Sequence, residues 1–258
     1  LIMFFLFSVI AVPLLALAID TVMLIPGVYA WDNLTLHYWI GEASYSIGLG
    51  TGEAGILQNS QLLSALGNTF TLAFVVAIIT GIIGVLVGYA IVKRRGTFIS
   101  KCLDQMSFLP YLIPSIALGA TLLAMFAVPR GPIPSLHGTF LLLVIVCSIS
   151  SLPYAVKAGI SAMRQIGNEL EEAAVMVGAS WWTRMRRILI PIQKSTYFAG
   201  MLLPFISVTR ELSLVILLVT PTTQLATTIS LMYTDRGWYP YTNGMVFLLT
   251  IIVVVCTV

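Results

Sequence analysis

Long runs of apolar residues dominate the chain, and short polar segments separate them. About 20 residues of α-helix, at 1.5 Å rise per residue, cross the hydrocarbon core of a bilayer, so runs of this length predict membrane-spanning helices. We expect six spans, at about residues 1–19, 70–92, 108–128, 139–154, 197–219 and 245–258. The predicted fold class is therefore an all-α membrane protein with six transmembrane helices, in which residues 1–258 form a single transmembrane domain. The first run begins without a methionine and the last run reaches the final residue, so we expect both ends to be truncated.

The first run has an alternative interpretation. Ala16-Leu17-Ala18 fits the small-residue site of signal peptidase, which would make this run a cleaved signal peptide. The basic segment that such a peptide needs is not in view, so we favour a membrane span. The other predicted spans are the same under either interpretation.

Composition supports a membrane protein and does not favour a metal site. Hydrophobic residues make up 59% of the chain and charged residues only 9%, which is far from the composition of a soluble globular domain. Cysteines and histidines are few and isolated, so neither a zinc site nor a disulfide framework is predicted. These residues are Cys102, Cys147, Cys256, His37 and His137.

Lysine and arginine gather in two of the segments between predicted spans. The segment after the second span contains Lys93, Arg94, Arg95 and Lys101. The segment between the fourth and fifth spans contains Lys157, Arg164, Arg184, Arg186, Arg187 and Lys194. By the positive-inside rule both segments face the cytoplasm, which also puts both chain ends there. The net charge of +3 arises from this asymmetry, so it indicates membrane orientation rather than nucleic-acid binding.

Aromatic residues flank the predicted spans on the outer side. Tryptophan and tyrosine favour the membrane interface, where an amphipathic ring acts as an anchor. We expect this role for Trp31, Tyr38, Trp39, Trp238, Tyr239 and Tyr241.

The inner segment 157–194 has the polar residues of two short helices joined at a glycine. Asn168 can cap the first helix, and Glu171, three residues later, would complete a capping box. Gly178 stands where a left-handed C-terminal cap is expected, and Ser180 can begin the second helix. The physical pattern supports two interpretations equally: a docking surface for another protein, or an amphipathic segment held at lipid headgroups by its tryptophans and arginines.

A spaced motif in this segment separates the two interpretations. Glu172-Ala173-Ala174, then Gly178, then Ile188-Leu189-Ile190-Pro191 resemble the EAA loop of the permeases of binding-protein-dependent ABC importers. That family pattern is EAA, G and I-x-L-P, and only Ile190 departs from it by replacing a leucine. Shorter motifs extend the resemblance over residues 66–258, namely Gly67-Asn68-Thr69, Leu109-Pro110, Ile113-Pro114 and Leu152-Pro153-Tyr154.

The resemblance implies a type I ABC importer permease in the bacterial inner membrane, either a separate subunit or one half of a fused tandem permease. The implied partners are a dimer of cytoplasmic ABC ATPase subunits, a second permease half, an extracytoplasmic substrate-binding protein and the lipid bilayer, with no nucleic acid. The residues implied to couple to the ATPase are Glu171, Glu172, Ala173, Ala174, Gly178, Ile188 and Pro191.

The chain has no G-x-x-x-x-G-K-[ST] sequence, the motif whose loop cradles nucleotide phosphates. We therefore expect no cofactor and no enzymatic activity on this chain, and ATP hydrolysis on a partner subunit.

Two charged residues, Arg210 and Glu211, fall inside the fifth apolar run. An ionised residue at mid-bilayer costs about 2.5 to 3.5 kcal/mol, so both should face protein or water. As neighbours on a helix they would point about 100° apart. One interpretation puts them on the translocation path or a gate, and the other makes them a structural ion pair.

The segment Arg210-Glu211-Leu212-Ser213 resembles ferric-iron permeases, so ferric iron is the first candidate substrate. Permeases for polyamines, thiamine and phosphonates share much of this pattern. The alternative function is an ion-coupled secondary transporter, which would also have intramembrane charges near broken helices but would not need the EAA-like loop.

Overall fold

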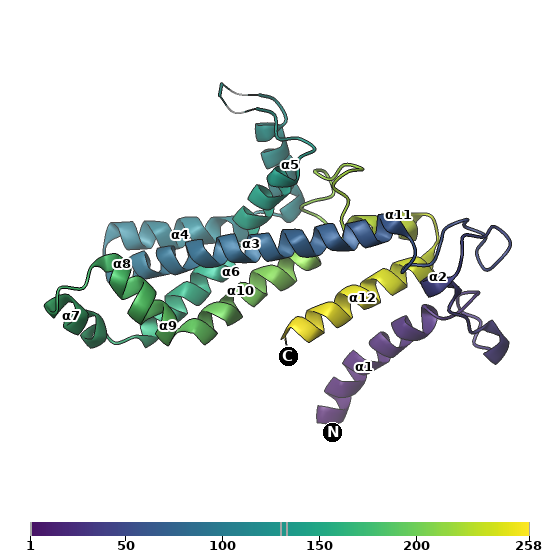
Figure 1. Ribbon diagram of the computed structural model, residues 1–258, viewed down its shortest axis with the longest axis horizontal. Helices are drawn as coiled ribbons and strands as arrows, with labels where there is room; N and C mark the ends of the chain where they lie inside the picture. The colour runs from purple at the N-terminus through teal and green to yellow at the C-terminus, as the bar shows by residue number, and fades with distance from the viewer. Residues whose placement is uncertain (1, 130, 133, 258) are drawn as a thin grey trace. The chain divides into compact units, whose positions relative to one another are not determined.

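Helices form nearly all of the regular structure in the computed structural model (Figure 1), which describes residues 2–129, 131–132 and 134–257. The elements of the first part of the chain are α1 (Ile2–Asp20), η1 (Trp31–Asn33), α2 (His37–Ile40), α3 (Ser60–Lys93), α4 (Phe98–Leu112), α5 (Ser115–Phe126) and α6 (Phe140–Gln165). The remaining elements are α7 (Asn168–Met176), α8 (Trp181–Arg184), the π-helical turn η2 (Met185–Leu189), α9 (Ile190–Ile192), α10 (Lys194–Thr209), α11 (Ala226–Asp235) and α12 (Tyr239–Thr257).

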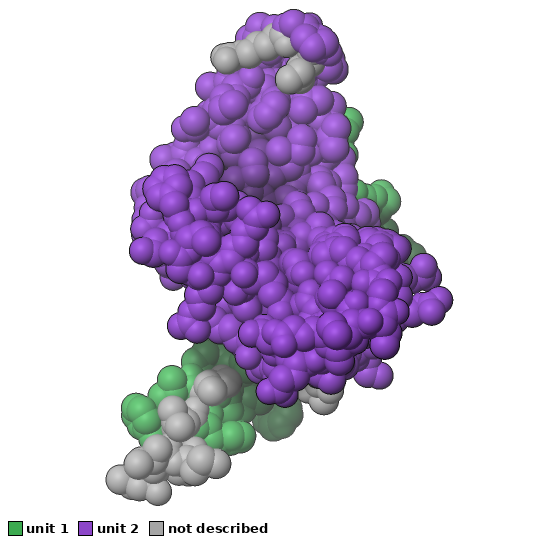
Figure 2. Space-filling view, turned by 90° about the vertical axis from the view of Figure 1, so that its left-hand side faces the viewer, with its two compact units in different colours: residues 1–70, 219–258 green, residues 71–218 purple. Residues whose placement is uncertain are grey.

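The chain divides into two compact units, which Figure 2 shows in different colours. Unit 1 comprises residues 1–70 and 219–258, and unit 2 comprises residues 71–218. The boundary at residue 70 falls inside α3. The interpretation of the whole chain as one transmembrane domain remains a prediction.

Three helices of the described part of the chain, α3, α6 and α12, are long and apolar enough to cross a membrane. The bent pair of α4 and α5 would add a fourth span if it crosses as one. The apolar part of α1 and the 16-residue α10 are shorter. The all-α membrane fold is confirmed, and the number of six spans remains a prediction. Both α6 and α12 are longer than predicted, because the helix continues into the polar segments beside each apolar run.

The third predicted span, 108–128, is wrong as a single helix. It is covered by α4 and α5, which meet at an angle of 104°. Between them Ile113 has an extended backbone (φ −91°, ψ 130°), as expected for the residue before a proline. Pro114 also lacks the N–H that would continue the helix. Proline therefore breaks the apolar run.

The fifth predicted span, 197–219, is wrong beyond Thr209, where α10 ends. The segment that follows is made of turns, and Glu211 Oε1 accepts a hydrogen bond from the backbone N–H of Leu214 at 3.0 Å. Such side-chain bonds offer the backbone an alternative to helix. Arg210 and Glu211 therefore do not share a helix. Leu214, Val215 and Leu218 are nevertheless buried, so part of this irregular segment is packed inside the protein.

The core of unit 1 contains three buried tyrosines, Tyr38, Tyr233 and Tyr241. The ring of Tyr241 lies 5.2 Å from that of Tyr38 and 5.6 Å from that of Tyr233, both edge-on. Its hydroxyl donates to the carbonyl oxygen of Glu53 at 2.9 Å. The prediction that Tyr38 and Tyr241 are interfacial anchors is wrong, because α2 folds against α12 and buries both rings.

Glycines let α3 and α6 approach closely in unit 2. A Cβ atom on Gly84 would collide with the backbone of Ala155, and one on Gly88 would collide with the backbone of Gly159. Small residues at such contacts are typical of helix pairs in membranes, where close packing replaces the hydrophobic driving force.

A second group of unit 2 residues packs α3, α6 and α10 against η2, in the second half of the inner segment 157–194, which we call the inner loop. These are Val85, Ala162, Met163, Met185, Leu189 and Tyr197. The C-terminal end of α3 is thereby held beside that loop.

Candidate functional site

The inner loop turns at a glycine, as the sequence predicts. After α7 ends, the N–H of Gly178 donates to the carbonyl of Val175 at 2.9 Å, and the N–H of Ala179 donates to the carbonyl of Ala174 at 3.0 Å. These two bonds form a Schellman motif. Gly178 has φ +79°, a conformation that residues with a Cβ atom rarely adopt. The predicted left-handed cap is confirmed.

Ser180 begins the next helix, also as predicted. Its Oγ accepts the backbone N–H of Thr183 at 3.3 Å. The helix continues as the π-helical turn η2, in which Met185 and Leu189 are almost fully buried. This half of the loop is therefore fixed to the core of unit 2.

The predicted capping box at the start of α7 is not formed. The N-cap residue is Gly167, and no side chain caps the helix. Asn168 Oδ1 instead accepts a hydrogen bond from Lys93 Nζ at 2.9 Å. The carboxylate of Glu171 is also taken up by partners on α3, so tertiary contacts replace the local bond that the spacing suggests.

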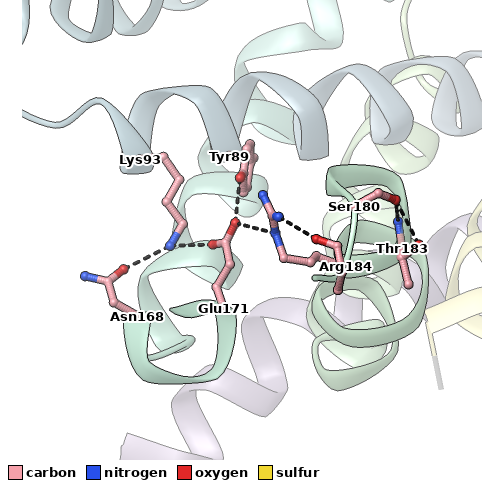
Figure 3. A network of polar contacts seen from close by, with 8 residues as sticks. Tyr89, Lys93, Asn168, Glu171, Ser180, Thr183 and Arg184 are labelled. Carbon is pink, nitrogen blue, oxygen red and sulfur yellow. Dashed lines mark hydrogen bonds and ion pairs between the residues drawn. The ribbon is translucent and has the colours of Figure 1, made fainter. Parts of the chain in front are cut away.

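Glu171 is the centre of a polar cluster that joins three helices (Figure 3). Its Oε2 lies 2.5 Å from Lys93 Nζ, and its Oε1 accepts the hydroxyl of Tyr89 at 2.7 Å. Oε1 also lies 3.4 Å from Arg184 Nε, and the same arginine donates through Nη1 to the carbonyl of Ala179 at 2.9 Å. We call Tyr89, Lys93, Glu171 and Arg184 the Glu171 cluster.

Charge pairing keeps the buried carboxylate ionised. Burial alone would raise the pKa of Glu171, but the hydrogen bonds from Lys93 and Tyr89 and the positive charges of Lys93 and Arg184 outweigh it. The pKa of Glu171 therefore lies below its ordinary value. A buried carboxylate held in this way depends on its partners, because removing one of them leaves its charge less fully compensated.

The exposed surface of α7 and of the residue after it is apolar toward its C-terminal end. Val175, Met176 and Val177 are 51%, 86% and 83% exposed. Beside them lies a surface hollow of about 430 Å³, lined by Lys93, Glu171, Glu172, Val175 and Met176. Large apolar side chains exposed together beside polar residues mark a contact surface. We call Glu172, Val175, Met176 and Val177 the α7 surface.

Some of the residues predicted to couple to an ATPase are buried in the protein, and others are exposed on the surface of the loop. Glu171 and Ala174 are buried, and Ile188 is half-buried. Exposed are Glu172, Ala173, Gly178 and Pro191. Arg210, which is exposed, and Glu211, which is half-buried, lie in the segment after α10 and are not members of the Glu171 cluster.

Three members of the Glu171 cluster were not predicted as site residues from the sequence, namely Tyr89, Lys93 and Arg184. Lys93 and Arg184 were predicted only as positive charges near the membrane. One available signal was the spacing of Tyr89 and Lys93, four residues apart on the last turns of a helix and thus on one face. Among the residues that the structure describes, no group of three or more His, Cys, Asp or Glu side chains could hold a metal ion.

Comparison with known proteins gives a family match over more than half of the chain. The family described as "Binding-protein-dependent transport system inner membrane component" matches residues 81–258. A ferric transport system permease protein of Actinobacillus pleuropneumoniae is 23% identical over 231 residues, which cover 85% of this chain and 33% of the relative. A sulfate transport system permease protein of Escherichia coli is 27% identical over 159 residues, which cover 58% of this chain and 56% of the relative. The chain thus spans about a third to just over half the length of these relatives.

A solved structure supports the same architecture. A bacterial ABC transporter for the import of the acidic polysaccharide alginate matches with a TM-score of 0.72 and 15% identity, over 99% of this chain and 90% of the other. At this identity the likeness shows the fold alone.

Proposed function

Because the chain belongs to the family of binding-protein-dependent transport system inner membrane components, we propose that it is the permease of an ATP-driven importer and that its inner loop docks on a separate cytoplasmic ABC ATPase. The observation that carries the docking site is the α7 surface, with its apolar residues exposed beside Glu172. The rest of the loop is fixed to unit 2 by Met185 and Leu189. The alternative of an ion-coupled secondary transporter is not favoured, because the family is one of importers that depend on a binding protein.

The proposal includes three partners for this chain. A dimer of ATPase subunits would take the α7 surface into a groove. A second permease half would complete the translocation path, and an extracytoplasmic binding protein would deliver the substrate at the outer face. The orientation rests on the basic residues that flank the inner loop, by the positive-inside rule.

The proposed mechanism is mechanical. Closure of the two ATPase subunits on ATP would move the inner loop, and the helices of unit 2 would rock between inward-facing and outward-facing states. A loop that carries force must be rigid, and this one is stiffened by the Schellman turn at Gly178, the cap at Ser180 and the Glu171 cluster.

For the substrate, ferric iron is our first proposal and sulfate the second. The ferric relative aligns with 85% of the chain and the sulfate relative with 58%. The segment Arg210-Glu211-Leu212-Ser213 also resembles ferric permeases. Uptake of radiolabelled iron and of radiolabelled sulfate by the assembled transporter decides between them.

The experiment that tests the function is capture of the ATPase subunit by the full permease, comparing wild type with Gly178→Val at equal membrane abundance. Valine is strained at φ +79°, so the turn after α7 should open and ATPase capture should be lost. The matched control is Gly237→Val. Gly237 has φ +77°, ends α11 in the same type of turn and, like Gly178, has open space around its Cβ position.

The control separates docking from general damage to the fold. Gly237→Val should carry the same backbone strain and keep ATPase capture. Equal capture by wild type and Gly178→Val would remove α7 as the docking site. No capture by wild type would argue against an ATPase-driven importer altogether.

A further inference from the structure

Polar contacts made by the first turn of α7 attach this helix to its neighbours in unit 2. The helix begins after Gly167 and ends at the Gly178 turn, so a glycine lies at each of its ends. The buried Ala174 and the polar contacts made by Asn168 and Glu171 hold α7 in place.

The contacts of Glu171 connect α7 to one membrane-spanning helix in particular. Tyr89 and Lys93 belong to the last turns of α3, which is long and apolar enough to cross a bilayer. The same helix packs on α6 through Gly84 and Gly88. A displacement of α7 that preserves these contacts must therefore move the end of α3, and α6 with it.

We propose that the Glu171 cluster is the joint through which movement of α7 is transmitted to α3, which makes Tyr89, Lys93, Glu171 and Arg184 positioning residues for transport. This inference rests on the proposed function and deepens it. Glu172 and its apolar neighbours contact the ATPase, whereas Glu171 faces inward and ties the docked helix to the membrane domain.

The chemistry of the cluster suits such a joint. The side chain of Glu171 is only 9% exposed and its two oxygens face different partners, so the carboxylate is fixed in direction as well as in position. Arg184 holds Glu171 and the carbonyl of Ala179 together, which also ties α7 to the turn that follows it. Loss of Lys93 leaves Arg184 as the charged partner of the buried carboxylate and breaks the ion pair between α7 and α3.

The test uses the complete transporter, reconstituted in vesicles with its ATPase, second permease half and binding protein. ATP hydrolysis and substrate uptake are measured in the same vesicles. We expect Glu171→Gln and Lys93→Met to retain ATPase capture and ATP hydrolysis, while uptake per ATP hydrolysed falls about tenfold. Tyr89→Phe removes one hydroxyl and no charge, so its uptake per ATP should fall by a smaller factor.

Two further variants distinguish a joint from general stabilisation. Lys93→Arg keeps the positive charge and should restore most of the uptake per ATP that Lys93→Met loses. Arg94→Met removes a neighbouring exposed charge outside the cluster and should behave as wild type. If the cluster only stabilised the fold, its loss would lower ATP hydrolysis, substrate uptake and protein abundance together. The uptake per ATP hydrolysed would then stay unchanged.

The inference is overturned if Glu171→Gln, Lys93→Met and Tyr89→Phe all keep the wild-type uptake per ATP. It is also overturned if these variants lose ATPase capture at normal abundance, because the cluster would then serve docking and not transmission. Should the charge variants fail to fold, Tyr89→Phe alone decides the question. Failure of wild type to capture any ATPase is a different result, which removes the proposed function itself.

Discussion

Two adjacent glutamates of α7 have opposite surroundings at the scale of single residues. Glu171 is buried among Tyr89, Lys93 and Arg184, and Glu172 is exposed beside the surface hollow. One residue along a helix turns the side chain by about 100°, which is enough to move it from an internal contact to a docking surface. The family motif includes Glu172, and the residue before it has its own structural task.

The Glu171 cluster predicts a pH dependence of stability. The pKa of Glu171 in the folded protein is lowered, whereas the pKa of an unfolded glutamate is about 4.3. The cluster therefore stabilises the fold fully above about pH 4.3, and this stabilisation is lost as the pH falls through the lower folded value. The Tm difference between wild type and Glu171→Gln in detergent should be largest at neutral pH and should shrink below about pH 4.

Glu172→Gln is the matched control for this prediction, since it makes the same chemical change on the exposed side of α7. Its Tm should follow that of wild type at every pH. A difference between wild type and Glu171→Gln that stays constant over the whole pH range would contradict the assigned ion pairs.

At this scale the sequence predicted correctly those features that depend on residues close together in the chain. The left-handed Gly178 and the cap at Ser180 depend on residues within one turn, and both are confirmed. The capping box of Asn168 and Glu171 failed because its competitors, Lys93 and Tyr89, lie 75 and 82 residues away in the sequence. Spacing along one segment does not reveal a partner on another helix.

At the scale of elements, apolar length alone did not show where helices end. The runs at 108–128 and 197–219 look continuous by composition, yet Pro114 breaks the first and the second stops being helical after Thr209. Irregular backbone at membrane depth is tolerated where protein encloses it or where it lines a cavity. In the second case Leu214 is buried in protein, whereas Ile216 and Leu217 are exposed.

The contact of α3 with α6 gives a prediction at this scale. Gly84→Ala adds a single methyl group that meets the backbone of Ala155, so it should destabilise the protein by about 1 to 3 kcal/mol. Gly67→Ala, on the same helix, adds the same group in open space and should be neutral or gain up to about 1 kcal/mol of helix propensity. Unfolding in detergent measures both changes.

Both substitutions change the helix propensity by the same amount, because each replaces glycine by alanine inside α3. The difference between their free energies of unfolding therefore reports the packing of α3 on α6. Destabilisation of similar size in both variants would contradict the close packing of α3 on α6. A loss confined to Gly84→Ala would support the rigid connection that the proposed joint needs.

At the scale of the whole molecule, composition and apolar run length were sufficient for the membrane class, and the spaced EAA-like motif was sufficient for the family. Composition and motifs did not predict which side chains pack together within each unit. Tyr38 and Tyr241 have the sequence position of interfacial anchors, but they pair in the core of unit 1 through contacts about 200 residues apart. An aromatic residue can be an interfacial anchor or a core residue, and the tertiary fold decides which of the two it becomes.

The orientation in the membrane is the prediction on which the proposed function depends most. In a variant with its three native cysteines replaced by serine, a single cysteine is introduced at an exposed position of either unit. Val177→Cys marks the α7 surface, where the native side chain is 83% exposed, and Trp31→Cys marks the first outer segment, where it is 92% exposed. Intact cells are then treated with a thiol reagent that cannot cross the membrane.

The positive-inside rule predicts different results for the two variants. Trp31→Cys should react in intact cells, and Val177→Cys should react only after the membrane is opened. Since ATP and its ATPase are cytoplasmic, reaction of Val177→Cys from outside would contradict the docking of α7 and the Glu171 joint together. If Trp31→Cys alone gave the opposite result and reacted only after the membrane was opened, the first outer segment would be reassigned to the cytoplasmic side. The position proposed for the inner loop would not change.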